Sequence, residues 1–260
     1  MFDFAGRKVL ITGCGSEGGI GFTTARLLRD MGAEIFITST TNRIFDRAQE
    51  LEISPQRAFV ADLSTWNSVE NLMLSVNQEL DGLDVLINNA GMTSVSKPAD
   101  STQEVGSAFD VNVEGFQESI RRNLSSALLV SKSALPLIRQ GTHPRIVMVS
   151  SVTGSLMAMR NDVGYASAKA GLIGMVRSIA LDEAKNGITC NAVSPGWIAT
   201  SSQLPHEHLE GLATPLGRSA TAEEVAAVLI FLASSEASYI TGQNIVVDGG
   251  NSIQEERTLG

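Results

Sequence analysis

The sequence lacks the features that mark disulfide-rich, membrane-spanning and nucleic-acid-binding proteins. It has only two cysteines, Cys14 and Cys190, whose spacing fits neither a metal site nor a redox pair, so we expect two free thiols in a reducing compartment. No run of about 18 apolar residues predicts a membrane span, and no basic segment followed by a long apolar one predicts a secretory signal. The formal net charge of −9 disfavours nucleic acid and anionic membranes as partners. We therefore expect a cytoplasmic protein.

Seven short apolar runs recur along the chain, and most of them do not alternate with polar residues. Strands that helices cover on both faces have this pattern, as in parallel sheets. The predicted strands are Val9–Thr12, Glu34–Thr38, Ala58–Ala61, Asp84–Asn88, Arg145–Ser150, Thr189–Val193 and Asn244–Val247. The predicted helices between them are Gly21–Met31, Ile44–Leu51, Thr65–Leu80, Phe116–Ile138, Ala166–Asn186 and Ala222–Ala233. This alternation predicts an α/β fold with a single Rossmann-type, doubly wound parallel sheet of about seven strands and helices on both faces.

The chain shows no internal repeat, low-complexity tract or interdomain linker. We therefore expect one domain over residues 1–250, followed by a polar tail over residues 251–260. Within the domain, Thr221 and Glu224 have the spacing of a helix-capping pair, so we expect the last helix to begin there.

A Gly-rich segment directly follows the first predicted strand. Five glycines lie within the nine positions from Gly13 to Gly21, and a helical pattern begins at Phe22. Bare backbone at this turn would let a cofactor pyrophosphate approach the N–H groups and the positive end of the helix. Gly13 would make the turn, while Gly19 and Gly21 would allow close approach and helix packing. A merely flexible loop would carry the same glycines, so this segment alone leaves both interpretations open.

Four further motifs follow the Gly-rich segment in a fixed order. They are Asn88-Asn89-Ala90-Gly91, Val149-Ser150-Ser151, Tyr165-Ala166-Ser167-Ala168-Lys169 and Ser194-Pro195-Gly196. Together with the Gly-rich turn they resemble the short-chain dehydrogenase/reductase family, and in particular its single-domain members such as the 3-oxoacyl-acyl-carrier-protein reductases. The resemblance covers nearly the whole chain and implies an NAD(P)-dependent oxidoreductase that transfers hydride between nicotinamide and a ketone or secondary alcohol.

Three intervals are longer than is usual in that family. The stretch Cys14–Gly18 lengthens the Gly-rich loop, which leaves open which of its amides would contact phosphate. Additional residues also lie within Ser94–Gly115, where we expect them near the substrate mouth. A small insertion within Ser155–Gly164 separates the serine motif from the tyrosine motif.

Tyr165 and Lys169 lie one helical turn apart, so a helix would place both on one face. An ammonium group near a phenol favours the phenolate and lowers the phenol pKa from about 10. A tyrosine tuned in this way can exchange a proton with a carbonyl or alcohol oxygen near neutral pH. On the pair alone, an exposed tyrosine and a solvated lysine remain the alternative. The resemblance implies that Tyr165 is the general acid in reduction and the base in oxidation, and that Lys169 also binds the nicotinamide ribose.

The resemblance implies two further catalytic residues. Ser151 would hydrogen-bond the reacting oxygen, and we prefer it to Ser150 because the family's serine is the last before Val-x-Gly. Asn123 would connect Lys169 to a water relay. Asn112 is the alternative, but it lies 39 residues before Ser151, whereas the 28 residues from Asn123 are close to the family's spacing.

The cofactor contacts implied by the resemblance lie where predicted strands end. Asn89, Ala90 and Gly91 would pass beside the adenosine ribose, with a plain strand-end turn as the alternative. Asp62 would contact adenine, or would cap the following helix. The other implied contacts are Ser16, Ile20 and Leu63, together with Pro195, Gly196, Ile198 and Thr200, of which Ile198 would offer its backbone amide and Thr200 its hydroxyl.

The residues after the second predicted strand bear on the choice between NADP and NAD. An acidic side chain at its end would bind both ribose hydroxyls and repel a 2′-phosphate, but Ser39 stands there. Ser39 and Thr40 can donate to a phosphate and Arg43 can reach it, so we expect NADP as the preferred cofactor and NAD as the alternative. Against this, Glu17 occupies a loop position where NADP-using relatives often have a basic residue, and Arg43 can equally be a solvated helix residue.

The sequence predicts less about the region around the substrate than about the cofactor site. By the resemblance, Ser201–Leu216 forms a lid, in which we expect His206 and His208 to be solvated, and we expect no metal site. The expected pocket walls are Thr153, Gly154, Ser155, Met157, Met159 and Trp197.

The small residues on the two long predicted helices imply, by the resemblance, pairing between subunits in a homotetramer or homodimer. The implied partner is a small carbonyl or alcohol compound. The main alternative function is a non-catalytic NAD(P)-binding sensor on the same fold. A nucleotide-sugar epimerase would need a further substrate domain, for which 260 residues leave little room.

Overall fold

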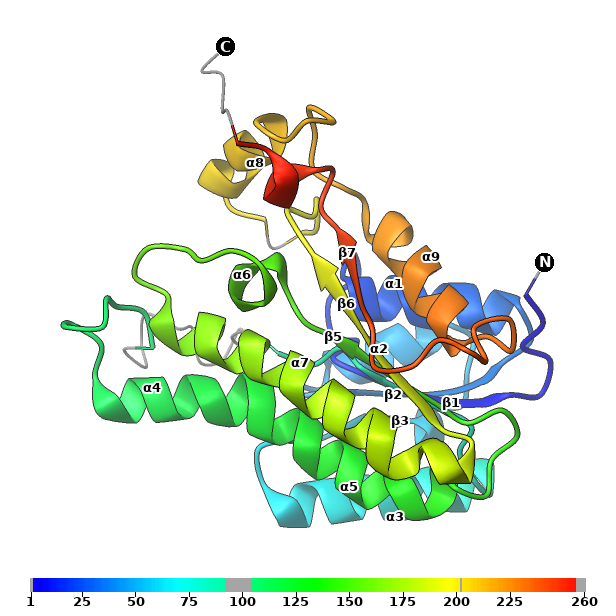
Figure 1. The fold of residues 1–260 in the computed structure, drawn as a ribbon. Coiled ribbons are helices and arrows are strands. Elements are labelled where there is room, and N and C mark those ends of the chain that lie inside the picture. The colour runs from blue at the N-terminus through cyan, green and yellow to red at the C-terminus, as the bar shows by residue number, and fades with distance from the viewer. Residues whose placement is uncertain (1, 92–103, 202, 256–260) are drawn as a thin grey trace.

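The computed structural model describes residues 2–91, 104–201 and 203–255, and within them one parallel sheet forms the centre of the molecule (Figure 1). Its seven strands lie in the order β3-β2-β1-β4-β5-β6-β7. The strands are β1 (Lys8–Thr12), β2 (Glu34–Ser39), β3 (Ala58–Val60), β4 (Val85–Asn88), β5 (Arg145–Val149), β6 (Thr189–Pro195) and β7 (Asn244–Val247). Every neighbouring pair is parallel, so the predicted fold class is confirmed.

The strand order reverses between β1 and β4. The chain first adds strands on one side of β1, then returns to its other side and continues outward. In open sheets of this kind a crevice forms outside the carboxyl ends of the strands at the reversal point, and ligands bind there. Gly13 follows β1 and Asn89 follows β4, so both lie at this point.

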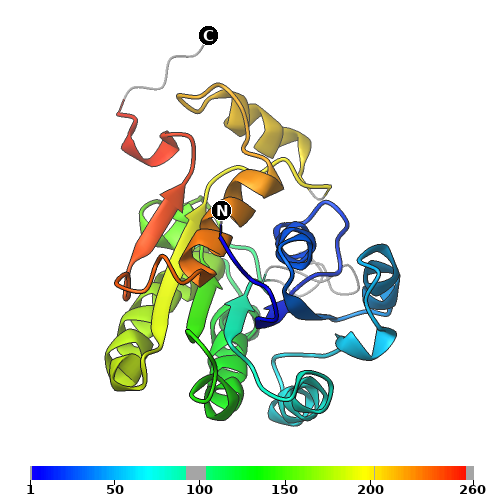
Figure 2. The ribbon, with the colours of Figure 1, turned by 90° about the vertical axis from the view of Figure 1, so that its right-hand side faces the viewer.

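Helices cover both faces of the sheet (Figure 2). One layer contains α1 (Ile20–Asp30), α2 (Arg43–Glu50) and α9 (Ala222–Ala233), whose apolar residues share one buried cluster. The second layer contains α3 (Trp66–Leu80), α5 (Ser126–Ile138) and α7 (Val163–Glu183). The remaining helices are α4 (Val113–Ile120), α6 (Val152–Ser155) and α8 (Pro205–Leu212).

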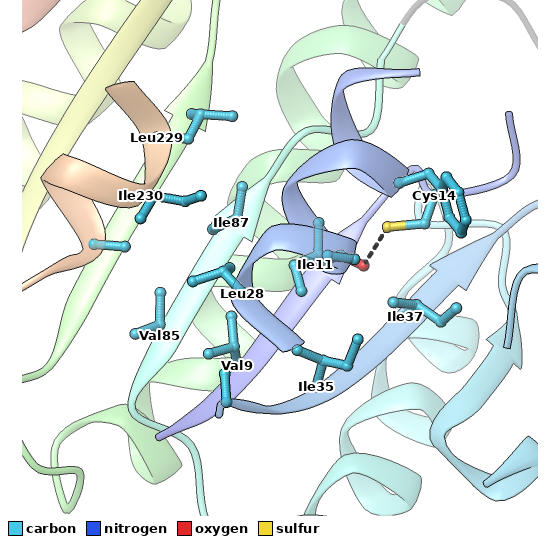
Figure 3. Close-up of a cluster of buried hydrophobic side chains, with 14 of the residues drawn as sticks. Val9, Ile11, Cys14, Leu28, Ile35, Ile37, Val85, Ile87, Leu229 and Ile230 are labelled. Atoms are coloured by element: carbon cyan, nitrogen blue, oxygen red, sulfur yellow. Dashed lines mark hydrogen bonds between the residues drawn. The ribbon is translucent and has the colours of Figure 1, made fainter. Parts of the chain in front are cut away.

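Burial on both sides explains why the strands lack alternation. Val9 and Ile11 of β1 belong to the cluster under α1 and α9 (Figure 3), whereas Leu10 belongs to the cluster under α3 and α5. All three side chains are 0% exposed, and each strand residue therefore has to be apolar whichever way it points.

The helix boundaries differ from the predicted ones mainly where tertiary contacts set them. The single predicted helix Phe116–Ile138 begins earlier, at Val113, and contains a π turn over Arg121–Ser125. The short helices α6 and α8 were not predicted. The predicted start of α9 is confirmed, because Thr221 Oγ1 accepts from Glu224 N at 3.3 Å and the Glu224 carboxylate accepts from Thr221 N at 2.8 Å.

Both cysteines are buried and unbridged. Burial raises the pKa of the Cys14 thiol, and it raises that of Cys190 to about 12. Neither thiol is therefore ionised near neutral pH. In the described part of the chain, no helix is long and apolar enough to cross a bilayer.

Candidate active site

The Gly-rich loop requires glycine at two positions for steric reasons. Gly13 has a φ of +75°, and a Cβ there would lie 2.8 Å from Asn89 Nδ2 and 2.9 Å from Ala90 Cα. A Cβ at Gly21 would meet Asn89 as well and would lie 2.8 Å from Gly13 O. Gly19, the N-cap of α1, provides no side-chain cap to that helix. The first turn of α1 thus faces the loop with bare backbone, which is the arrangement that holds a phosphate.

The ends of β1 and β4 are clamped together by side chains. Thr12 Oγ1 accepts from the backbone N–H groups of Asn89 at 3.1 Å and Ala90 at 3.0 Å. Asn89 Nδ2 in turn donates to Thr12 O at 3.0 Å and to Gly13 O at 3.1 Å. The tight strand-end turn that was the alternative for Asn89 is therefore present, and it also fixes the floor of the crevice.

Replacing Gly21 with Ala is expected to weaken cofactor binding and to destabilise the fold by about 1–3 kcal/mol, because the new methyl group meets the Asn89 clamp. Thermal unfolding and a cofactor titration would measure the two effects. Gly174→Ala is the steric control within one subunit, since nothing in the same chain lies within 4 Å of a Cβ there and removal of a helical glycine stabilises by about 0.5–1 kcal/mol. Equal behaviour of the two variants would contradict this account of the loop.

Two serines follow β5, and the structure gives them different contacts. Ser150 is buried; its Oγ donates to Lys169 O at 2.9 Å and its N–H donates to Val193 O at 2.7 Å. Ser151 Oγ accepts from Thr153 N at 3.1 Å and also hydrogen-bonds the Tyr165 side chain. Ser150 thus joins strand to helix, while Ser151 is the serine beside the phenol, in agreement with the predicted choice.

Lys169 is almost completely buried, with 3% of its surface exposed. Its Nζ donates to Val149 O at 2.9 Å and lies 5.5 Å from the centroid of the Tyr165 ring. Burial lowers the pKa of this ammonium to about 8. The side chain lies at the carboxyl end of the sheet, because Gly91 after β4 would bring a Cβ to within 3.1 Å of Lys169 Nζ.

Asn123 lies at the same point. A Cβ at Gly91 would also be 3.1 Å from Asn123 Oδ1, so the amide and the ammonium converge above Gly91. Asn123 is 3% exposed and sits in the π turn, where its Nδ2 donates to Ser119 O at 3.1 Å. Asn112 instead begins α4, with Oδ1 accepting from Glu114 N at 2.8 Å. The predicted preference for Asn123 over Asn112 therefore agrees with the geometry, and π turns are frequent at functional sites.

The expected lowering of the Tyr165 pKa was wrong for this structure. Burial raises the pKa of Tyr165 to about 12, the hydrogen bond with Ser151 opposes that rise, and the negative charges of Asp162 and Glu207 add to it. The desolvation of a phenolate at this position therefore outweighs the stabilising hydrogen bond with Ser151. Tyr165 is accordingly protonated at neutral pH, which is the form that a proton donor needs.

The end of β2 places a cation beside the Gly-rich loop. Ser39 Oγ donates to Thr41 O at 2.9 Å, and a Cβ at Gly15 would lie 3.0 Å from Ser39 Cβ and 3.8 Å from Arg43 Nη2. Arg43 Nε donates to Thr41 Oγ1 at 3.2 Å. The exposed Arg43 is thus held near the loop, and Thr40 is exposed between the two.

Glu17, the residue that favours NAD, lies near the guanidinium of Arg47. Arg47 Nη1 lies 3.9 Å from Glu17 Oε2, and the guanidinium also lies over the Phe22 ring at 5.4 Å. The same guanidinium forms a closer ion pair with Glu50, so Arg47 is not a dedicated partner of Glu17.

The predicted adenine contact occupies an exposed turn. Asp62 Oδ1 accepts from Ser64 N at 3.0 Å and from Ser64 Oγ at 2.6 Å. The N-cap of α3 is Thr65, so Asp62 closes the turn before the helix and does not cap it. Leu63 beside it is buried, with 7% of its surface exposed.

The segment after β6 runs along the other side of the crevice. Pro195 ends the strand, and a Cβ at Gly196 would lie 2.8 Å from Asp248 Cβ. Ile198 pairs with Ala220, and Ile198 O accepts from Thr200 N at 2.9 Å. This pairing directs the predicted contact residues past the ends of the strands.

One contact across the crevice was not predicted. Ser16 Oγ and Ser201 Oγ lie 2.9 Å apart, although 185 residues separate them in sequence. The additional length of the Gly-rich loop allows this contact, and it is the sequence feature from which the contact could have been predicted. This contact therefore joins the Gly-rich loop to the segment that precedes α8.

The expected pocket walls lie around the start of α7. Met157 is half-buried and its Sδ accepts from Asn251 Nδ2 at 3.6 Å, while Met159 is 41% exposed. His206 and His208 are exposed on α8, as predicted. In the ranges that the structure describes, no group of three or more His, Cys, Asp or Glu side chains could hold a metal ion.

Part of the longer interval before α4 lies beside the start of α7. Gly106 N donates to Asn161 O at 2.8 Å, and Gly106 forms a bridge with Asp162, three residues before Tyr165. Buried Glu104 forms an ion pair with Arg122 at 3.0 Å. Glu104 and Gly106 thus lie near the start of α7, and the position of this interval at the substrate mouth stays a prediction, while residues 94–103 lie outside the described part.

Asp162 was missed by the sequence reasoning. Burial raises the pKa of its carboxyl to about 6, whereas the pKa of an unfolded aspartate is about 3.9. The folded state therefore binds more protons than the unfolded state between these values, so stability falls as pH rises through this window and the cost persists above it. Asp162→Asn should raise the melting temperature at pH 8 (prediction), and the gain should shrink towards pH 4. A gain that is independent of pH would contradict this explanation.

Comparison with known proteins identifies the family. A sequence model described as enoyl-(acyl carrier protein) reductase matches residues 13–252, which is nearly the whole chain. The chain belongs to the short-chain dehydrogenase/reductase family. Its seven-stranded parallel sheet with flanking helices agrees with that assignment.

Several members of the short-chain dehydrogenase/reductase family are similar over their full length. The 3-oxoacyl-[acyl-carrier-protein] reductase FabG of Escherichia coli is 32% identical over 252 residues, covering 95% of this chain and 98% of its own. Oxidoreductase UcpA of Salmonella typhimurium is 32% identical over 274 residues, covering 100% of both. Among solved structures, the aldohexose dehydrogenase of Thermoplasma acidophilum superposes with a TM-score of 0.85 at 28% identity, covering 100% of both chains. A short-chain dehydrogenase/reductase from Caenorhabditis elegans gives 0.83 at 29% identity, covering 96% of each.

As a short-chain dehydrogenase/reductase, the protein is an NAD(P)-dependent oxidoreductase that acts on small molecules. The residues present fit the dinucleotide. Side chains at Gly13 and Gly21 would fill the approach to the loop, and the start of α1 has no side-chain cap. Lys169 and Asn123 line the far end of the same crevice.

Proposed function

We propose that the protein transfers hydride between NADP and a ketone or secondary alcohol, with Tyr165 as the general acid/base. The observation that carries this proposal is the convergence of Tyr165, Ser151, Lys169 and Asn123 at the carboxyl edge of the sheet. The phenol hydrogen-bonds Ser151, and the ammonium lies 5.5 Å from the phenol ring. These groups suit proton transfer to oxygen, which carbonyl reduction requires.

Each residue has one task in this mechanism. The bound nicotinamide supplies or accepts the hydride. In reduction, Tyr165 gives its proton to the carbonyl oxygen and Ser151 donates a hydrogen bond to the same oxygen. Ser151 Oγ already accepts from Thr153 N at 3.1 Å, which leaves its hydroxyl hydrogen for this bond. Lys169 stabilises the phenolate that remains, and Asn123 connects Lys169 to solvent through a water relay. Oxidation of an alcohol reverses these proton movements.

We propose NADP as the preferred cofactor and NAD as the alternative. The lack of an acid at Ser39 and the nearby guanidinium of Arg43 support this preference. The exposed Glu17 supports the alternative. In this arrangement Ser39, Thr40 and Arg43 contact the 2′-phosphate. The Gly-rich loop holds the pyrophosphate with Gly13, Ser16, Gly19, Ile20 and Gly21. The remaining contacts are Asp62, Leu63, Asn89, Ala90 and Gly91, and Pro195, Gly196, Ile198 and Thr200.

Nicotinamide absorbance with purified protein tests the proposal. NADPH and NADH are each combined with a set of ketones and with an enoyl thioester, because the matching family model is described as an enoyl reductase. We expect NADPH oxidation with ketones, because the hydroxyl groups of Tyr165 and Ser151 can both donate to the carbonyl oxygen of a ketone. Turnover of the enoyl thioester alone would contradict the proposed substrate class. Cofactor binding without any turnover would favour the NAD(P)-binding sensor.

We also propose a cytoplasmic homotetramer or homodimer with one domain over residues 1–250 and a tail over 251–260. The helices expected at the subunit contacts carry exposed apolar side chains, with Val113 at 65%, Leu128 at 47% and Leu181 at 81% exposed. Light scattering of the purified protein measures the mass, and a monomer would contradict this assembly.

A further inference from the structure

Three acidic side chains surround the start of α7, and two of them have partners. Glu207 of α8 accepts from Leu204 N at 2.7 Å, so it serves as a helix cap. Glu104, in the interval before α4, pairs with Arg122 at 3.0 Å. Asp162 is different, because its carboxylate has no hydrogen bond or ion pair with any residue that the structure describes.

The position of Asp162 relates this carboxylate to the reacting groups. It precedes Tyr165 by three residues, so the two side chains lie on the same side of the helix start. The charge of Asp162 acts on the Tyr165 phenol, which places the two groups within electrostatic range. The bridge to Gly106 fixes the backbone of Asp162 against the interval before α4. The carboxylate is thus held, half-buried, at the mouth of the proposed catalytic site.

A half-buried carboxylate without a partner is costly, and a ligand that donates a hydrogen bond removes that cost. The charge of Glu207 also acts on the Tyr165 phenol, and neither group supplies a positive charge. Arg160 is exposed two residues earlier and makes no ion pair with Asp162. A substrate carboxylate would therefore meet repulsion here, whereas a hydroxyl or ammonium group would be attracted.

We propose that Asp162 determines substrate specificity by binding a hydrogen-bond donor, a hydroxyl or an ammonium group, near the reacting carbon of the substrate. The inference rests on the proposed ketone/alcohol function and names its substrate class. Asp162 takes no part in the hydride or proton transfer.

Four ketones that differ only at one end test the inference with the full-length protein. Pentan-2-one, 4-hydroxybutan-2-one, 4-aminobutan-2-one and 4-oxopentanoate share one methyl ketone and end in methyl, hydroxyl, ammonium and carboxylate groups. We expect kcat/KM for the hydroxyl and ammonium compounds to exceed that for pentan-2-one by about tenfold or more, as for a hydrogen bond to a charged group. The carboxylate compound should be the poorest substrate.

Variants separate recognition from folding. In Asp162→Asn the advantage of the ammonium compound should disappear, while the hydroxyl compound keeps part of its advantage because the amide oxygen still accepts. Asp162→Ala should remove both advantages. Asp182→Asn is the control, since Asp182 is an exposed aspartate on the same helix, and it should keep the wild-type order. The inference is overturned if pentan-2-one equals the two donor compounds in the wild type, or if Asp162→Asn keeps the order.

Binding of the same four compounds to the cofactor-loaded protein, measured by saturation-transfer NMR, distinguishes the two proposals. Preferential binding of the hydroxyl and ammonium compounds that Asp162→Ala abolishes, without turnover, would support the role of Asp162 and refute the ketone reductase. Turnover of all four ketones with equal binding and equal kcat/KM would support the reductase and refute the role of Asp162. Failure of both order and turnover would refute both.

Discussion

Replacing Tyr165 with Phe is expected to lower kcat for ketone reduction by about 10²- to 10⁴-fold, the usual contribution of a general acid. The substitution removes only the hydroxyl group, which hydrogen-bonds Ser151, and keeps the ring beside Lys169. Steady-state kinetics with NADPH and an active ketone would measure the loss. The Kd for NADPH should rise by less than about tenfold, because at most one hydrogen bond to the cofactor is lost.

The chain has a second tyrosine that serves as the control. Tyr239 is fully exposed and lies in the segment before β7, at the amino end of that strand and not at the carboxyl end where Tyr165 lies. Tyr239→Phe should retain the wild-type kcat. Unchanged activity in Tyr165→Phe would remove the acid/base role, whereas an equal loss in both variants would indicate a general effect on the protein.

Replacing Ser39 with Asp is expected to reverse the cofactor preference from NADPH to NADH. The new carboxylate would stand at the end of β2, where it can accept from both ribose hydroxyls and repel a 2′-phosphate. Arg43→Ala should raise the Kd for NADPH by about tenfold or more, because a charge-assisted contact to phosphate is lost, while the Kd for NADH stays nearly unchanged. Cofactor titrations of both variants with both nucleotides would measure these shifts.

Arg57→Ala is a suitable control for this pair. Arg57 precedes β3, so it lies at the amino end of that strand, whereas the crevice lies at the carboxyl ends of the strands. Its guanidinium pairs with Glu34 at 2.7 Å. Its loss should change neither nucleotide's Kd. If wild type prefers NADH, or if Arg43→Ala weakens both nucleotides equally, the assignment of the 2′-phosphate to Arg43 is wrong.

The parts of the fold that sequence alone predicted are those set by burial on both faces. Val9, Leu10 and Ile11 are all apolar because adjacent residues face different helix layers. This continuous apolar run can be recognised in the sequence without knowing which helices cover it. Thr221 and Glu224 were predictable for another reason, because their reciprocal hydrogen bonds involve only local backbone. The predicted site residues Ser151 and Lys169 were found through motifs that resemble those of the family, and the structure places both of them beside Tyr165.

The features that were missed depend on contacts distant in sequence. The π turn around Asn123 depends on packing against α7, and no local residue pattern requires it. The Ser16–Ser201 contact joins two loops that the sheet brings together. The raised pKa of Tyr165 depends on how far distant segments shield the half-buried phenol from water, which spacing along a helix does not reveal. For the same reason Asp162 looked like an ordinary residue before a helix.

A crystal structure of the protein with NADP bound tests the central claim most directly. The account predicts that the nicotinamide ribose hydroxyls lie within about 2.6–3.2 Å of the Tyr165 hydroxyl and Lys169 Nζ, with the pyrophosphate against the loop Gly13–Gly21. A nicotinamide ring that lies outside the crevice between this loop and α7, or a Lys169 ammonium that makes no contact with the ribose, would contradict the account.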